Sequence, residues 1–308
     1  MVGLTGKGLA VEVAGLELRS PTLNASGVLG MSASLLKRVY DSGAGAVVTK
    51  SLGPTARPGH INPTVVEVEG GILNAMGLPN PSVESYLPEL QELKHQSVKV
   101  VASFFASTVD EFQSSAKALC GAGADALELK LSCPNVGGEP GMCAADPISV
   151  ERVTAAIKQV ATAPVFVKLS PNVTDIAGIA VAAEKGGADG ITAVNTLKAM
   201  AIDADFRRPI LTNVTGGLSG PALKSVALRC VWEIAEAVKV PIIGCGGVTY
   251  WRDAVEFMLA GASAVEIGTG VMYEGFEVYG RVNDGIAKYL VENKFGSVKE
   301  IVGLAHRK

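Results

Sequence analysis

Four times along the chain, a glycine–alanine corner is followed at once by a short apolar run. The four segments are SGAGAVVTK (42–50), GAGADALEL (121–129), GGADGITAV (186–194) and GASAVEIGT (261–269). The corner is typical of a helix that ends on glycine, and the apolar run is typical of a strand buried on both faces. The repeat therefore predicts units of helix and strand that pack into a parallel sheet.

Further apolar runs and helical patterns extend this alternation. The additional strand candidates are PTLNAS (21–26), VKVVASF (98–104), PVFVKLS (164–170) and VPIIGCG (240–246). Helical periodicity covers residues 33–42, 109–119, 146–161 and 225–238. Eight strand–helix units in 308 residues predict an α/β fold, a (β/α)8 TIM barrel. An open doubly wound sheet is the alternative, but no G-x-G-x-x-G motif follows the first strand.

The predicted strands are unevenly spaced. Long insertions follow the second, fourth and sixth strands, over residues 51–97, 132–163 and 195–239. Because barrel enzymes carry their chemistry on the loops after the strands, we expect these insertions to form an active site. No linker or low-complexity tract divides the chain, so we expect a single domain over residues 1–308.

Composition and charge exclude several classes of protein. The net charge is −3 without a basic run, which argues against nucleic-acid binding. No apolar run is long enough for a membrane span, and the first residues lack a signal-peptide pattern. Five cysteines, an odd number, indicate reduced thiols and a cytoplasmic location. With three histidines and no CxxC motif, we expect no metal site.

Two glycine-rich loops and three lysines indicate an anionic ligand. The loops GCGGV (244–248) and IGTG (267–270) follow the seventh and eighth strands, where barrels commonly bind phosphate. Lys50, Lys130 and Lys168 lie on or just after other strands. One such lysine is usually solvated, but several at one barrel mouth favour an anion or an electron-rich ring such as a flavin.

Three asparagines and one cysteine lie in the same loops. Asn74, Asn135 and Asn195 each follow a different strand. An asparagine often forms a turn, but three together suit a ligand with alternating N–H and C=O groups. Cys133 lies in a polar loop, where its thiol could be core filler, a nucleophile or a general base.

Several motifs, in this order, resemble the class 1 dihydroorotate dehydrogenases over almost the whole chain. NAMGLPNP (74–81), SCPN (132–135) and GGLSGPALK (216–224) are the most specific of them. The others are ASG (25–27), TKS (49–51), VKLSP (167–171), NT (195–196), GCGGV and IGTG. The stretch from Asn195 to Arg229 is most similar to the B-type members.

The resemblance implies a (β/α)8 barrel that holds FMN at its mouth. It implies oxidation of (S)-dihydroorotate to orotate in de novo pyrimidine (UMP) biosynthesis. Cys133 would be the general base that removes the C5 proton, while hydride passes from C6 to FMN N5. The alternative is a dihydropyrimidine dehydrogenase-type FMN enzyme, which acts on dihydrouracil or dihydrothymine. In those enzymes histidine usually follows the SCP motif, where this chain has Asn135.

The resemblance also implies a set of binding residues. The substrate would meet Lys50, Asn74, Ala75, Met76, Gly77, Leu78, Asn135, Asn195 and Thr196. FMN would meet Ser26, Lys50, Ser51, Lys130, Lys168, Val194, Gly220, Gly246, Gly247, Gly268 and Thr269. The loop from Pro134 to Pro147 would act as a lid. Lys130 and Ser103 depart from the family pattern, which usually has asparagine at both positions.

B-type members pair with a second subunit that carries FAD and a [2Fe–2S] cluster and passes electrons to NAD. The resemblance therefore implies a homodimer of this chain that binds such a subunit to give a heterotetramer.

Overall fold

The computed structural model describes residues 8–131 and 145–307. Its central sheet has eight parallel strands in the order β3-β16-β15-β10-β9-β8-β7-β4. A parallel bridge between Leu23 and Ala46 joins the two ends of this order, so the sheet closes into a barrel. The strands are β3 (Thr22–Asn24), β4 (Val47–Val48), β7 (Val100–Phe104), β8 (Ala126–Lys130), β9 (Val165–Leu169), β10 (Gly190–Ala193), β15 (Ile242–Cys245) and β16 (Ala262–Ile267). The predicted (β/α)8 architecture is confirmed.

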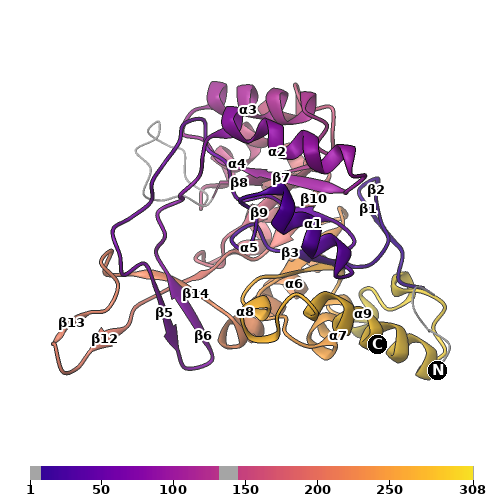
Figure 1. The fold of residues 1–308 in the computed structure, drawn as a ribbon. Helices are drawn as coiled ribbons and strands as arrows, with labels where there is room; N and C mark the ends of the chain where they lie inside the picture. Colours follow the sequence, from indigo (N-terminus) through magenta and orange to yellow (C-terminus); the bar gives the residue numbers. More distant parts are fainter. Residues whose placement is uncertain (1–7, 132–144, 308) are drawn as a thin grey trace.

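Helices surround the barrel, and neighbouring helices contact one another around it (Figure 1). The longer ones are α1 (Ala33–Asp41), α2 (Val83–His95), α3 (Val109–Gly121), α4 (Pro147–Lys158), α5 (Ile176–Lys185), α6 (Lys224–Ala237), α7 (Trp251–Leu259) and α9 (Val278–Glu292). The short ones are α8 (Gly270–Glu274), η1 (Pro221–Leu223), η2 (Val298–Glu300) and η3 (Leu304–His306). Within the described ranges, no helix is long and apolar enough to cross a membrane.

The repeated glycine corners end four of these helices. Gly43, Gly123, Gly187 and Gly261 directly follow the C-caps of α1, α3, α5 and α7, and each has a positive φ. A residue with a side chain would be strained in this left-handed conformation. The repeat seen in the sequence is thus the turn that leads each of these helices into the next strand.

A hairpin packs against the apolar side chains at the amino-terminal end of the barrel. Its strands are β1 (Val11–Val13) and β2 (Leu16–Leu18), which pair antiparallel. Side chains of both strands share one buried cluster with interior residues of the barrel, including Val48, Phe166 and Ile243. The amino-terminal end of the barrel is therefore filled, and only the carboxyl-terminal end is left for a ligand.

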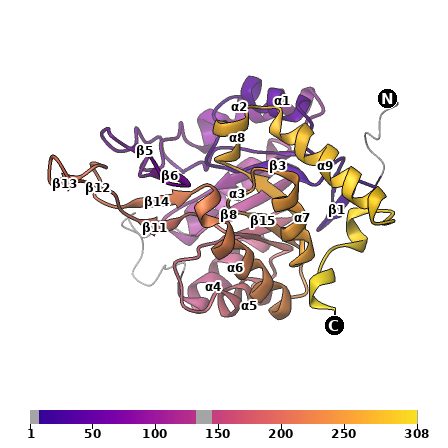
Figure 2. The ribbon, with the colours of Figure 1, turned by 90° about the horizontal axis from the view of Figure 1, so that it is seen from below.

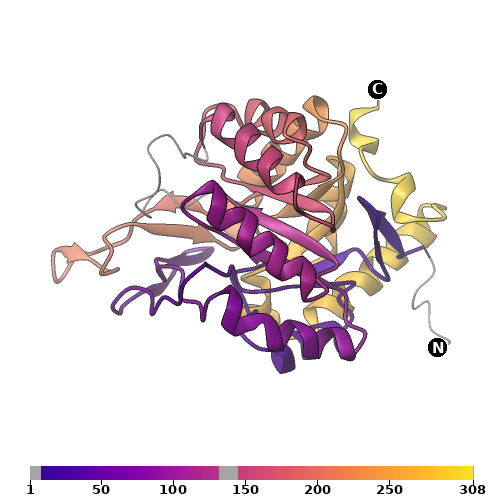
Figure 3. The same cartoon turned by 90° about the horizontal axis from the view of Figure 1, so that it is seen from above.

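A second sheet extends from the carboxyl ends of the barrel strands. It pairs β11 (Leu197–Ala199), β14 (Gly216–Ser219), β6 (Gly71–Asn74) and β5 (Val65–Val68), in that order. The small pair β12 (Ile202–Asp203) and β13 (Arg208–Pro209) lies at its tip. Figures 2 and 3 show this extension on the side of the molecule opposite the β1–β2 hairpin. Its strands come from the segments after β4 and β10, two of the three predicted insertions.

Candidate active site

The barrel interior changes from apolar to polar toward the carboxyl ends of the strands. On β8, Leu127 and Leu129 belong to the core beneath the helices, whereas Ala126 belongs to the cluster inside the barrel. Glu128 therefore also faces the interior, where it is fully buried. The buried side chains with polar or titratable groups at this level come from six strands: Ser103, Glu128, Lys168, Thr192, Cys245 and Glu266. Barrel interiors are usually filled by branched apolar residues, so this layer is unusual.

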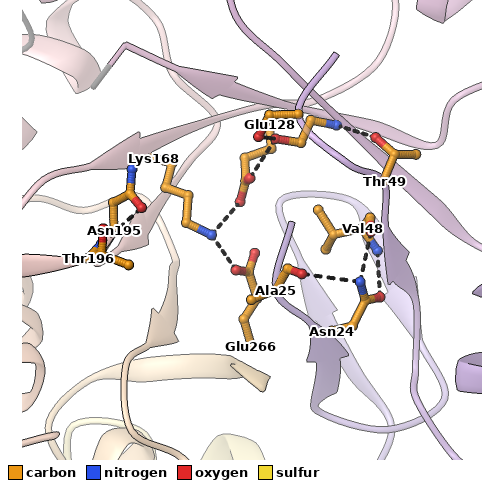
Figure 4. A network of polar contacts seen from close by, with 11 residues as sticks. Asn24, Ala25, Val48, Thr49, Glu128, Lys168, Asn195, Thr196 and Glu266 are labelled. Atoms are coloured by element: carbon orange, nitrogen blue, oxygen red, sulfur yellow. Dashed lines mark hydrogen bonds and ion pairs between the residues drawn. The ribbon is translucent and has the colours of Figure 1, made fainter. Parts of the chain in front are cut away.

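Lys168 lies between two buried carboxylates (Figure 4). Its Nζ is 3.3 Å from Glu128 Oε2 and also contacts Glu266 Oε2. The other oxygen of Glu128 accepts a hydrogen bond from Ser103 Oγ at 2.9 Å. Sequence analysis predicted that Lys168 lies at the site, but it missed both carboxylates. Their alternation with apolar neighbours was the available signal, because it places them inside the barrel.

The two carboxyl groups differ in acidity. Burial and the charge of Glu128 raise the pKa of Glu266 to about 8. Burial acts against ionisation of Glu128 too, but Lys168, together with hydrogen bonds from Glu266 and Ser103, holds its pKa below the ordinary value. Burial raises the pKa of the neighbouring Cys245 thiol, so this cysteine stays protonated. At neutral pH the cluster thus contains one ammonium, one carboxylate and one carboxylic acid.

Lys50 presents a buried ammonium without a counter-charge. The residue is 7% exposed, and its side chain has no ion pair or hydrogen bond with any described residue. Burial lowers its pKa. Because an unpaired buried charge is costly, such a side chain indicates a binding site for an anion.

The two glycine loops present unsatisfied donors. In the described part of the chain, the backbone N–H groups of Gly246, Gly247, Gly268 and Thr269 have no hydrogen-bond partner. Convergent N–H groups without partners form a cradle for an oxyanion such as phosphate. A Cβ built on Gly268 would meet only Ala25, at 3.4 Å, so the protein itself leaves open space there. These observations fit the phosphate of FMN.

The predicted substrate loop, residues 74–78, is held by Asn80. The buried Asn80 accepts hydrogen bonds at Oδ1 from the N–H groups of Gly53 and Ser82, at 2.9 and 3.0 Å. Its Nδ2 donates to the carbonyl of Leu78 at 2.9 Å. Asn80 lies within the NAMGLPNP motif, but sequence analysis assigned it no role.

The second sheet brings Asn74 toward Thr196. Asn74 pairs with Gly217 of β14, and a Cβ on Gly217 would collide with Thr196. The Thr196 backbone N–H donates to Asn195 Oδ1 at 2.9 Å. Asn172, which sequence analysis also missed, donates from Nδ2 to the carbonyl of Thr196 at 2.9 Å. The structure therefore gathers the asparagines from the first and third insertions.

Of the remaining predicted residues, some lie at the barrel mouth and others lie outside the described ranges. Ser26, Ser51 and Val194 are buried at the carboxyl ends of β3, β4 and β10, and Lys130 is the register partner of Lys168 on the adjacent strand. Gly220 lies next to η1, where its Cβ would meet Gly71 at 2.8 Å. Cys133, Asn135 and most of the predicted lid lie outside the described residues.

Comparison with known proteins shows the family to which the chain belongs. A family profile described as dihydroorotate dehydrogenase matches residues 8–290. The chain belongs to the dihydroorotate dehydrogenase family. It is 50% identical to the dihydroorotate dehydrogenase B (NAD(+)) catalytic subunit of Methanocella arvoryzae, over 97% of this chain and 98% of that one. The catalytic subunit of the same name from Pyrococcus horikoshii is 48% identical, over 96% and 97%.

The dihydroorotate dehydrogenase fold is also seen in a solved structure. The crystal structure of DHODH from Eimeria tenella in complex with ferulenol has a TM-score of 0.83 and 24% identity, covering 97% of this chain and 89% of that one. As a member of this family, the chain is an oxidoreductase. Among the described residues, no group of histidine, cysteine and acidic side chains could hold a metal ion.

Proposed function

We propose that this chain oxidises (S)-dihydroorotate to orotate with bound FMN, in the cytoplasmic de novo pathway to UMP. One observation carries the proposal: the glycine loops after β15 and β16 present four N–H donors without partners among the described residues. The family membership and the unpaired ammonium of Lys50 at the same barrel mouth support it.

FMN, when bound, supplies a flavin ring that accepts hydride. Gly246, Gly247, Gly268 and Thr269 would hold its phosphate, since no residue in the described ranges bonds to their N–H groups. Lysine near the ring compensates the negative charge that the ring gains on reduction. The full cofactor set that we propose is Ser26, Lys50, Ser51, Lys130, Lys168, Val194, Gly220, Gly246, Gly247, Gly268 and Thr269.

The substrate would lie between the second sheet and the barrel mouth. Lys50 would neutralise its carboxylate, and Asn74, Asn195 and Thr196 would bind its amide edges. The backbone of residues 75–78 completes the proposed pocket. Cys133 would act as general base, and Asn135 would contact the substrate; both lie in the loop 134–147 or just before it, which would exclude water.

The test is anaerobic mixing of the purified protein with L-dihydroorotate while flavin absorbance is followed. The wild-type flavin should bleach, and Cys133→Ala should bleach at least about a hundredfold more slowly, because general-base catalysis typically contributes 10²–10⁴ in rate. A yellow protein that dihydrouracil bleaches, and dihydroorotate does not, would instead make this a dihydropyrimidine dehydrogenase-type enzyme. A colourless protein without bound flavin would contradict the proposal.

We further propose that the chain forms a homodimer and binds a second subunit with FAD and a [2Fe–2S] cluster. The names of its relatives, each a catalytic subunit of an NAD(+)-linked enzyme, support this heterotetramer.

A further inference from the structure

The buried carboxylate pair is connected to the barrel mouth by two hydroxyl groups. Ser103 Oγ donates to Glu128 Oε1 at 2.9 Å, and Ser51 Oγ lies 3.1 Å from Ser103 Oγ. Because the proton of Ser103 is used toward Glu128, Ser51 is the donor in the contact between the serines. The hydrogen bonds therefore run in one direction, from Ser51 at the end of β4 to Glu128 inside the barrel.

Ser103 is the residue that allows this connection. It is fully buried, and its own N–H donates to Thr49 Oγ1 at 3.0 Å, which fixes its position. A hydroxyl can accept one proton and release another, so it can transfer protons along a chain. The asparagine that the family usually has at this position would present an amide, which does not exchange protons in this way.

We propose that Ser51, Ser103, Glu128 and Glu266 form a proton relay, in which Glu266, at a pH where it is ionised, takes up one proton from water when the neighbouring cofactor is reduced. This inference rests on the proposed function, because it needs a cofactor that gains negative charge near Lys168. In this step the Glu266 carboxylate accepts a proton and becomes a carboxylic acid, and no electron reaches it. Lys168 transmits the effect, since it contacts both carboxyl groups.

Four ionisable groups act on Glu266, and none of them exchanges a proton near neutral pH. Glu128 of β8 and Lys168 of β9 stay ionised, and Cys245 of β15 stays a thiol. Tyr279 of α9 also stays neutral, because burial raises its pKa. Glu266, with a pKa of about 8, is therefore the group that changes charge near physiological pH.

The cofactor-loaded protein tests the relay without its substrate. We would reduce it with dithionite between pH 7 and 10 and measure both the midpoint potential and the protons taken up. One proton per two electrons changes a potential by about 30 mV per pH unit. Above pH 8, wild type should therefore show a slope about 30 mV per pH unit steeper than Glu266→Gln. If Glu266→Gln does not fold, Glu128→Gln should lose the extra slope as well. Equal slopes in wild type and variant would overturn the proposal.

The serines are tested by rate. With a pH indicator in stopped flow, Ser103→Ala should slow proton uptake at least tenfold but leave the number of protons unchanged. Thr192→Val is the matched control, since this buried hydroxyl faces the same layer and has no hydrogen-bond partner in the part of the chain that the structure describes; the variant should behave as wild type. A wild-type rate in Ser103→Ala would refute the relay.

Stability of the protein without cofactor separates this inference from the proposed function. Because the pKa of Glu266 is raised by folding, the folded state binds the extra proton between about pH 4.5 and 8. The stabilisation that this proton gives should be complete below about pH 4.5 and lost as the pH rises through about 8. The free energy of unfolding of Glu266→Gln should lack this dependence on pH. Its presence in a protein that binds no flavin would refute only the proposed function; its absence would refute the proton site.

Discussion

At the scale of single residues, the buried amide of Asn80 holds the proposed substrate loop in place. Asn80 satisfies two backbone donors and one carbonyl, and it thereby joins Gly53, the start of α2 and the substrate loop at Leu78. Leu78 and Gly77 both have a positive φ, so the loop needs external support to keep its shape. If residues 74–78 bind the substrate as proposed, Asn80 is a positioning residue for that binding.

Replacement of Asn80 by alanine should weaken both stability and substrate binding. A buried group left without its partner costs about 1–3 kcal/mol, so the free energy of unfolding should fall by roughly 2 kcal/mol. The KM for dihydroorotate should rise more than kcat falls. Asn80→Asp keeps the acceptor for Gly53 and Ser82 but loses the donor to Leu78, so it should retain more stability. The exposed Asn213→Ala is the control; if Asn80→Ala matched it in KM and in denaturant midpoint, the assigned role would be wrong.

At the scale of elements, the loops after β15 and β16 are glycine-rich for different reasons. Gly246 has a φ of +132°, and a Cβ there would lie 2.6 Å from Ala227 Cβ on α6. Packing alone therefore requires glycine at this position. A Cβ on Gly268 would contact only Ala25, so packing does not require glycine there and the open space points to a ligand.

Two alanine substitutions should separate these roles. Gly246→Ala should destabilise the protein by about 1–3 kcal/mol, the usual cost of overpacking. Gly268→Ala should change stability by less than about 0.5 kcal/mol, as surface substitutions do, but weaken FMN binding roughly tenfold. Flavin fluorescence titration and thermal unfolding would measure the two effects. Gly121→Ala, with no atom near its Cβ, is the control. FMN affinity unchanged in Gly268→Ala would argue against a phosphate site at this loop.

At the scale of the whole molecule, the barrel carries its proposed chemistry at one end only. The second sheet projects beside the mouth, and the β1–β2 hairpin fills the opposite end (Figure 1). That a single domain spans residues 1–308 stays a prediction. The proposed transfer of electrons to NAD requires groups that this chain would obtain from its partner.

The isolated chain should therefore reduce an artificial dye with dihydroorotate but reduce NAD at least a hundredfold more slowly. Dye reduction serves as the internal control, because it reports an intact FMN site. Comparable rates with NAD and the dye would show that no partner subunit is needed.

The sequence alone determined the barrel, because its helix-to-strand corners and buried strands are local patterns set by backbone conformation and burial. Ordered motifs likewise located the loops of the site. Only the tertiary structure decided which side chains from distant strands meet inside the barrel. Glu128 and Glu266 lie on strands that are not neighbours in the sheet, and only closure of the barrel brings them onto Lys168. The raised pKa of Glu266 follows from its burial and from the nearby charge of Glu128, which no single segment of the chain specifies.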